Sequence, residues 1–125
     1  MRCAMKIGGD IIEIERIAQA ISNSERFRSR VFTASELAYC CSRGKQADAS
    51  LAGIFAAKEA FIKALGIGMR YGSWQDIEIG HDELGAPTIT CTGRFRQIFD
   101  EKGYTFMEVS ISHARRYATA QVLIG

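Results

Sequence analysis

Two carboxylates and a lysine are the side chains with the clearest capacity for chemistry in this sequence of 125 residues. Asp10 lies among isoleucines in KIGGDII, and Glu59 lies in the apolar stretch LAGIFAAKEAFIKALGIG, where Lys63 follows four residues later. A charge in apolar surroundings is costly unless it is paired or serves a ligand. Two carboxylates that leave other positions open suit Mg²⁺, and a lysine beside them suits a phosphate. The set therefore indicates phosphoryl-transfer chemistry.

Ordinary structural roles would account for the same residues. Glu59 and Lys63 have the spacing of a helical salt bridge, which contributes a few tenths of a kcal/mol. Asp10 has the position of a cap for the helix that follows it. Lys58 lies within the apolar arc of the long stretch, and we expect it to run along the core or to pair with a carboxylate elsewhere. The sequence does not place Asp10 beside Glu59, so both interpretations stand.

The segment Leu51–Gly68 is predicted to be a long buried helix around which the chain is organised. It has strong helix formers in its middle, and its apolar residues recur at helical spacing. We expect Gly66 to end the helix. Glu59 and Lys63 share one stripe of this helix with small residues, which are expected to leave room for a ligand: Ala52, Ala56 and Gly66.

The other elements are predicted to be short. Helices are expected over 13–22, 33–41 and 93–102, and strands over 6–12, 74–79, 88–91, 105–112 and 117–124. Thr33 and Glu36 have the spacing of a capping box. The arginines of Glu25–Val31 indicate either a solvated face or a surface for an acidic partner. The glycines of the first strand suggest a bend or a close backbone approach. The predicted fold class is α+β, one domain over 1–125 with an antiparallel sheet packed against the long central helix.

Composition excludes several classes of protein. Sixteen basic and fourteen acidic residues leave a net charge of +2, too little to indicate binding of nucleic acid. No apolar run is long enough for a signal peptide or a membrane span. The four cysteines contain no CxxC pair, so free thiols in the cytoplasm are expected: Cys3, Cys40, Cys41 and Cys91.

Five motifs follow one another along nearly the whole chain. They are GGDIIEIERI at 8–17, RFRSRVFTASE at 26–36, FAAKEAFIKALGIG at 55–68, SWQDIEI at 73–79 and SISHARRYATAQVLI at 110–124. In order and spacing they resemble the motifs of the holo-[acyl-carrier-protein] synthases, the small single-domain type of phosphopantetheinyl transferase. The resemblance implies the phosphopantetheinyl transferase fold.

The resemblance also implies a reaction. Such an enzyme moves the 4'-phosphopantetheine arm of coenzyme A onto a serine of apo-acyl-carrier protein, releases adenosine 3',5'-bisphosphate, and supports fatty acid biosynthesis. By position, Asp10 and Glu59 would be Mg²⁺ ligands and, with Lys63, catalytic. Coenzyme A would contact Lys63, Gly66 and His113.

The same resemblance implies the partners. Arg16, Arg26 and Arg30 would face the acidic carrier protein, and the protein would work as a homotrimer with shared active sites. Ile54 and Ala86 depart from the family pattern, because many relatives have basic residues there, and they bear on affinity for coenzyme A. The alternative is a non-catalytic module of the same fold that binds carrier protein or nucleotide. A module of that kind has no need of the Asp10–Glu59–Lys63 set.

Overall fold

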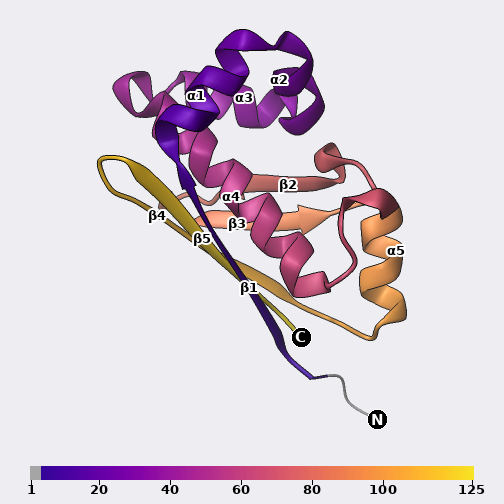
Figure 1. The fold of residues 1–125 in the computed structure, drawn as a ribbon. Helices are drawn as coiled ribbons and strands as arrows, with labels where there is room; N and C mark the ends of the chain where they lie inside the picture. Colours follow the sequence, from indigo (N-terminus) through magenta and orange to yellow (C-terminus); the bar gives the residue numbers. More distant parts are fainter. Residues whose placement is uncertain (1–3) are drawn as a thin grey trace.

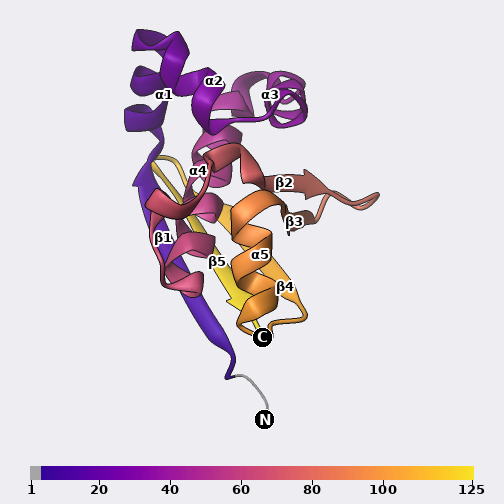
Figure 2. The same cartoon turned by 90° about the vertical axis from the view of Figure 1, so that its right-hand side faces the viewer.

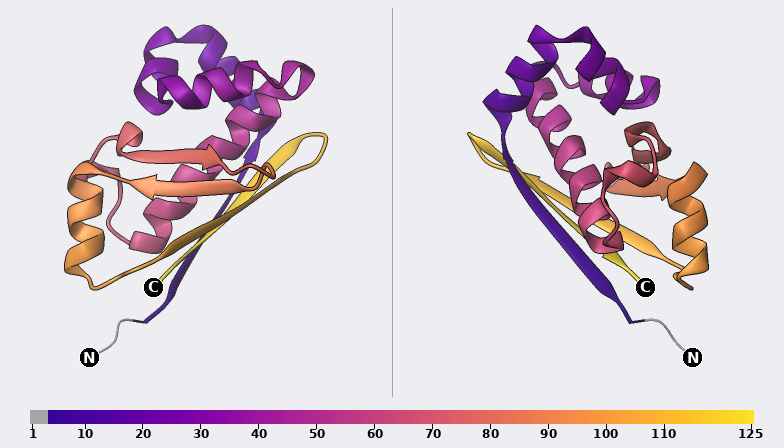
Figure 3. Two further views of the ribbon diagram at one scale, coloured as in Figure 1. Left: turned by 180° about the vertical axis from the view of Figure 1, so that it is seen from behind. Right: turned by 45° about the vertical axis from the view of Figure 1, so that its right-hand side comes forward.

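Helix α4 (Ala47–Leu65) runs through the middle of the molecule, as predicted. In this computed structural model, which describes residues 4–125, the β2–β3 hairpin crosses behind α4 in Figure 1 and in front of it in the reverse view of Figure 3. The helix ends at Leu65 because Gly66 adopts a left-handed conformation with φ of 80°, which glycine accepts without a steric penalty. Cys3 lies outside the described residues.

The elements confirm the α+β class and come in the order that follows. They are β1 (Lys6–Glu13), α1 (Ile14–Asn23), α2 (Glu25–Val31), α3 (Ala34–Cys41), α4, β2 (Ile77–His81), β3 (Pro87–Cys91), α5 (Gly93–Glu101), β4 (Met107–His113) and β5 (Tyr117–Ile124). Short 3₁₀ turns lie at Gly44–Gln46, Met69–Tyr71 and Trp74–Asp76. Helices α1 to α3 gather at the amino-terminal end of α4, and the carboxyl terminus lies near its other end (Figure 1).

The strands form two antiparallel sheets instead of one. Strands β1, β5 and β4 pair in that order, and β2 pairs with β3 as a separate hairpin that projects to one side in Figure 2. In the larger sheet Asp10 is opposite Ala120, which is opposite Ile111. Alternate residues of β5 are buried, so one face of this sheet packs on α4.

Glycine at position 8 allows β1 to lie directly on α4. A Cβ atom there would overlap the carbonyl oxygen of Ala60 and lie 2.7 Å from the amide nitrogen of Ala64. This confirms the close approach expected from the glycines of the first strand. Asp10 is two residues further along the same face of β1, so the approach at Gly8 brings its carboxylate to the helix.

The small residues on α4 make room for the sheet, which corrects the expectation that they leave space for a ligand. Ala52 and Ala56 are fully buried. Ala52 packs in one cluster with Ile17 and Ala118, and Ala56 lies in the main core. Short side chains on both surfaces let the backbones of helix and sheet approach closely.

The arginine-rich segment Glu25–Val31 forms a helix, α2, which was not predicted. Its amino terminus is capped by Ser24, whose hydroxyl accepts a hydrogen bond from the amide of Phe27. The predicted capping box of α3 is confirmed, because Thr33 and Glu36 exchange side-chain and backbone hydrogen bonds.

The strand predicted over 74–79 begins only at Ile77. Residues Trp74–Asp76 instead form a 3₁₀ turn, because Ser73 and Asp76 make a second capping box that bends the chain before the strand. Two further findings concern residues 4–125 alone. Cys40, Cys41 and Cys91 are free thiols, and no helix is long and apolar enough to cross a membrane.

Candidate active site

Strand β1 and helix α4 bring the predicted lysine and one predicted carboxylate into contact. The ammonium group of Lys63 donates hydrogen bonds to Oδ1 of Asp10 and to the carbonyl oxygen of Gly9, both at 3.1 Å. Lys63 thus pairs with Asp10 instead of making the alternative helical salt bridge to Glu59. The interpretation of Asp10 as a helix cap is wrong, because Glu13 takes the capping position of α1 without a side-chain bond.

Glu59 lies close enough to Asp10 for the two charges to interact. Partial burial raises the pKa of Glu59, the negative charge of Asp10 raises it further, and the ammonium group of Lys63 opposes both effects. Two carboxylates that repel each other beside a single lysine leave an excess of negative charge. The position therefore favours an added cation.

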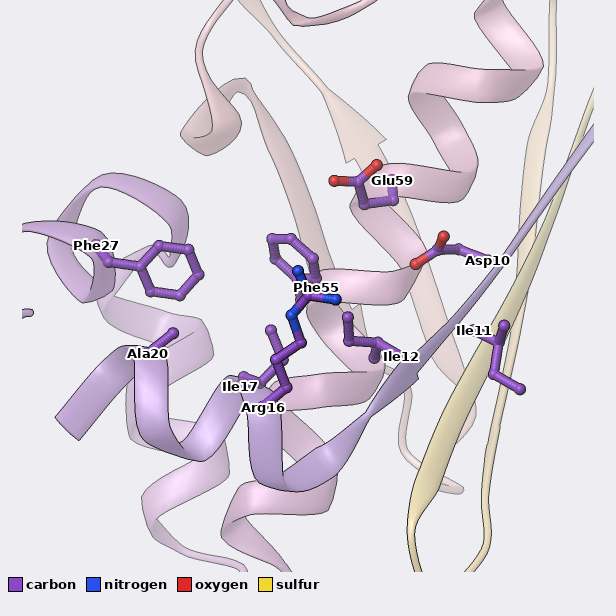
Figure 4. A pocket seen from close by; sticks show the side chains of 9 residues that line it. All are labelled: Asp10, Ile11, Ile12, Arg16, Ile17, Ala20, Phe27, Phe55 and Glu59. Carbon is purple, nitrogen blue, oxygen red and sulfur yellow. The ribbon is translucent and has the colours of Figure 1, made fainter. Parts of the chain in front are cut away.

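Both carboxylates open into a cavity of about 500 Å³. Figure 4 shows Asp10 and Glu59 at one end of this cavity, Phe27 and Ala20 at the other, and Arg16 between them. The remaining lining residues are apolar: Ile11, Ile12, Ile17 and Phe55. The cavity thus joins a charged end to an apolar compartment under α1 and α2.

The residues present fit a magnesium ion that shares its coordination with a ligand. Among residues 4–125 no three His, Cys, Asp or Glu side chains come together as a complete metal site. Asp10 and Glu59 supply two hard oxygen ligands, and Mg²⁺ commonly takes one or two carboxylates together with water and phosphate oxygens. The donor set is suited to Mg²⁺ and unsuited to a closed zinc site.

The other predicted coenzyme A residues lie apart from this cavity within one chain. His113 ends β4 and lines two cavities at the amino-terminal end of α4, of about 570 Å³ and about 200 Å³. Gly66 lies at the carboxyl end of α4, one turn after Lys63. A single chain therefore joins Asp10, Glu59 and Lys63, and it does not bring His113 to them.

The predicted carrier-protein residues lie on α1 and α2. Arg16 is exposed and lines the cavity of the carboxylates. Arg26 is exposed on α2, and Arg30 lines a neighbouring hollow with Arg70 and Trp74. Of the three arginines, Arg16 lines the apolar compartment, whereas Arg26 and Arg30 lie on α2 outside its lining.

Sequence reasoning left Lys58 without a function, and the structure gives it a partner. Its ammonium group lies 2.8 Å from Oε1 of Glu36, and both side chains are wholly buried. It also donates hydrogen bonds to the carbonyl oxygens of Val31 at 2.7 Å and Trp74 at 3.1 Å. The expected pairing with a distant carboxylate is thus confirmed, although the identity of Glu36 was hidden by its capping motif.

Known proteins are similar to this chain in both sequence and fold. The model of the 4'-phosphopantetheinyl transferase superfamily matches residues 6–122. The holo-[acyl-carrier-protein] synthase of Moorella thermoacetica is 47% identical over 120 residues, covering 96% of this chain and 93% of the relative. That of Fusobacterium nucleatum is 45% identical over 119 residues, covering 94% and 96%.

Solved structures of holo-[acyl-carrier-protein] synthases have a similar fold. The Helicobacter pylori holo-[acyl-carrier-protein] synthase in complex with coenzyme A superimposes with a TM-score of 0.82 at 34% identity, covering 95% of this chain and 99% of that one. The Neisseria meningitidis enzyme gives 0.85 at 35% identity, covering 96% and 97%. The chain therefore belongs to the 4'-phosphopantetheinyl transferase superfamily and, within it, to the holo-[acyl-carrier-protein] synthases.

Proposed function

We propose that this protein transfers 4'-phosphopantetheine from coenzyme A to a serine of an apo-acyl-carrier protein, and so supports fatty acid biosynthesis. The observation that carries the proposal is the Asp10–Lys63 pair beside Glu59 at the mouth of an apolar compartment. A binding module would not need two mutually repelling carboxylates there. The free thiols agree with action in the cytoplasm.

The residues of the site would divide the work of phosphoryl transfer. Asp10 and Glu59 would hold Mg²⁺, which supplies charge neutralisation at the pyrophosphate of coenzyme A. Lys63 uses two of its three N–H groups on Asp10 and Gly9, and its side chain is 53% exposed. The third N–H would bind a phosphate oxygen and hold the pyrophosphate beside the carboxylates.

The arginines of α1 and α2 would receive the carrier protein. Arg16 lies inside the cavity mouth, with Arg26 and Arg30 further out on α2. Acidic side chains of a partner would pair with these groups, and complementary charge raises the rate of encounter. The apolar compartment beneath, which Phe27 and Phe55 line, would accept an apolar side chain of the carrier protein.

Basic and aromatic side chains surround the cavity shared by His113 and Ile54, where many relatives have arginine in place of the isoleucine. Arg43 lies there with its guanidinium 5.8 Å from the ring centre of Tyr39. Tyr39 stacks on His81 with 3.7 Å between ring centres. Arg43 would supply the phosphate contact that Ile54 lacks, in the nucleotide part of the coenzyme A site.

A homotrimer would bring His113 of one subunit to the carboxylates of its neighbour. The face of the larger sheet that points away from α4 exposes apolar side chains, with Ile7 72% and Ile11 62% exposed. Exposed apolar patches of this kind mark interaction surfaces. Light scattering would test this, because Ile7→Glu should convert trimers to single chains and lower transfer, whereas Glu108→Gln on the same face should leave trimers intact.

Mass spectrometry tests the proposed reaction. Apo-carrier protein incubated with this protein, coenzyme A and Mg²⁺ should gain the mass of one phosphopantetheine, and chelation of Mg²⁺ should prevent the gain. A carrier protein that binds without any gain in mass would favour the non-catalytic module.

A further inference from the structure

Lys58 precedes Glu59 on α4, yet its side chain points into the core and takes no part in the proposed chemistry. Its three N–H groups have three acceptors: the carboxylate of Glu36 and the carbonyl oxygens of Val31 and Trp74. An ammonium group offers three donors, so all are used. Among residues 4–125 no buried side-chain nitrogen or oxygen lacks a partner.

The three acceptors come from three different segments, and one of these segments, α2, contributes Phe27 to the lining of the cavity. Val31 is the last residue of α2, where a helix leaves carbonyl groups without partners. Glu36 lies in the first turn of α3, and its second oxygen accepts a hydrogen bond from the amide of Ile79 in β2 at 2.8 Å. Trp74 begins the turn before β2. Lys58 therefore ties four segments to α4 at one point.

Gln75 holds the same end of α2 from the outside. Its side-chain amide donates to the carbonyl oxygens of Ser29 and Phe32, the latter at 3.0 Å. The positive charge of Lys58 is also favourable at the carboxyl end of a helix. Two side chains on separate elements thus complete the capping of α2.

The fixed end of α2 sets the positions of residues that line the cavity. Phe27 of α2 lies 6.0 Å from Phe55 between ring centres, and Phe55 stacks on Trp74 at 5.3 Å. Arg26 and Arg30 lie on the same two turns of α2. A shift of α2 would move an apolar wall and the arginines together.

We propose that Lys58 is a positioning residue that holds α2 in the orientation required for docking of the carrier protein. The inference depends on the proposed function. It assigns Lys58 to recognition of the carrier protein, separate from the adjacent Glu59, which serves the metal. Loss of the Lys58 bonds should impair use of the carrier protein and leave use of coenzyme A unchanged.

Steady-state kinetics with each substrate varied in turn tests the inference. Gln75→Ala removes one of the two caps of α2 without burying a charge, and it should raise KM for the carrier protein on the order of fivefold. Lys58→Met should raise it on the order of tenfold or more. KM for coenzyme A should stay within about twofold in both variants, because α2 is proposed to contact the carrier protein. A purely structural defect would instead lower the folded fraction, and with it kcat, without a change in either KM.

Lys102→Met is the matched control, because this lysine also donates to a carbonyl at a helix end, that of Leu65 in α4, at 3.3 Å. It should leave KM for the carrier protein unchanged. Unchanged KM values in Gln75→Ala would overturn the inference, even if Lys58→Met fails to fold. A wild-type protein that transfers nothing would instead overturn the proposed function, so the two failures are distinct.

Discussion

Helix α4 contributes the lysines of two lysine–carboxylate pairs. The two pairs contain the same kinds of charged group and differ in burial and in hydrogen bonding. Lys58 and Glu36 approach to 2.8 Å with neither side chain exposed, whereas Lys63 and Asp10 approach to 3.1 Å with side chains 53% and 15% exposed. Every N–H of Lys58 is bonded within the protein. Lys63 retains exposure, and a second carboxylate, Glu59, lies beside its partner.

The difference separates a buried, fully bonded ion pair from one that is partly exposed and has an additional carboxylate beside it. Burial lowers the pKa of Lys58, and the carboxylate of Glu36 opposes that effect, so the buried ammonium group depends on its partner. Burial and the charge of Asp10 raise the pKa of Glu59, which no such partner fully compensates. A compensated charge is typical of a structural ion pair such as Lys58–Glu36. An uncompensated charge favours a ligand, and we call the group of Asp10, Glu59 and Lys63 the open site.

The largest effect is expected from Glu59→Gln in the open site. Removal of one of the two carboxylates should lower the rate of phosphopantetheine transfer by about 10³-fold, the upper range for loss of one electrostatic group. The fold should persist, because glutamine has the same shape. Transfer rates and circular dichroism spectra of the two proteins provide the check, and full retained turnover would exclude Glu59 from metal binding.

Lys58→Met should have its main effect on stability, in contrast to Glu59→Gln, which should lower the transfer rate and leave the fold intact. It leaves Glu36 as an uncompensated buried charge, which costs about 3–5 kcal/mol of folding free energy. Urea denaturation of this variant and of Lys102→Met would measure the loss. A change below about 1 kcal/mol would show that the pair is not the structural site described here.

Stability should depend on pH through the open site. The raised pKa means that the folded chain keeps the proton of Glu59 at pH values where the unfolded chain has lost it, above the ordinary value of 4.5. The folded state then binds more protons, so the free energy of unfolding falls as pH rises through that window. Denaturation curves should show a steeper fall for the wild type than for Glu59→Gln, and parallel curves would contradict the assignment.

A smaller effect is expected at the rim of the cavity. Arg16→Gln should raise KM for the carrier protein by about three- to tenfold at low salt, with a smaller difference at high salt. KM for coenzyme A should not change. Equal effects at both salt concentrations would indicate that Arg16 contributes packing instead of charge.

Much of the fold was predictable because local patterns carry it. The apolar periodicity of 51–65, the glycine at 66 and the Thr33–Glu36 spacing predicted a helix, its end and a capping box, and all three are confirmed. Helix α2 was not predicted because Glu25–Val31 was interpreted only as an arginine-rich surface, and Ser24 was not recognised as a helix cap. The two-sheet arrangement also went unpredicted, because β1 pairs with β5 across nearly the whole chain.

The candidate site was predictable in its residues but not in its assembly. Asp10, Glu59 and Lys63 stand out as charges in apolar segments, and the structure brings them together through the close approach at Gly8. Sequence spacing does not reveal which carboxylate meets which lysine over such separations. The carboxylate partner expected for Lys58 was therefore not identified as Glu36, which was interpreted only as part of a capping box.

The most direct test of this account is the transfer rate of Lys63→Met at a matched concentration of folded protein. The account predicts a loss of about 10²-fold in phosphopantetheine transfer, measured as mass gain of the carrier protein over time. It also predicts a change in unfolding free energy below about 1 kcal/mol, as for other exposed ion pairs. A variant that keeps the wild-type transfer rate at that matched concentration would contradict the assignment of the Lys63–Asp10 pair to chemistry.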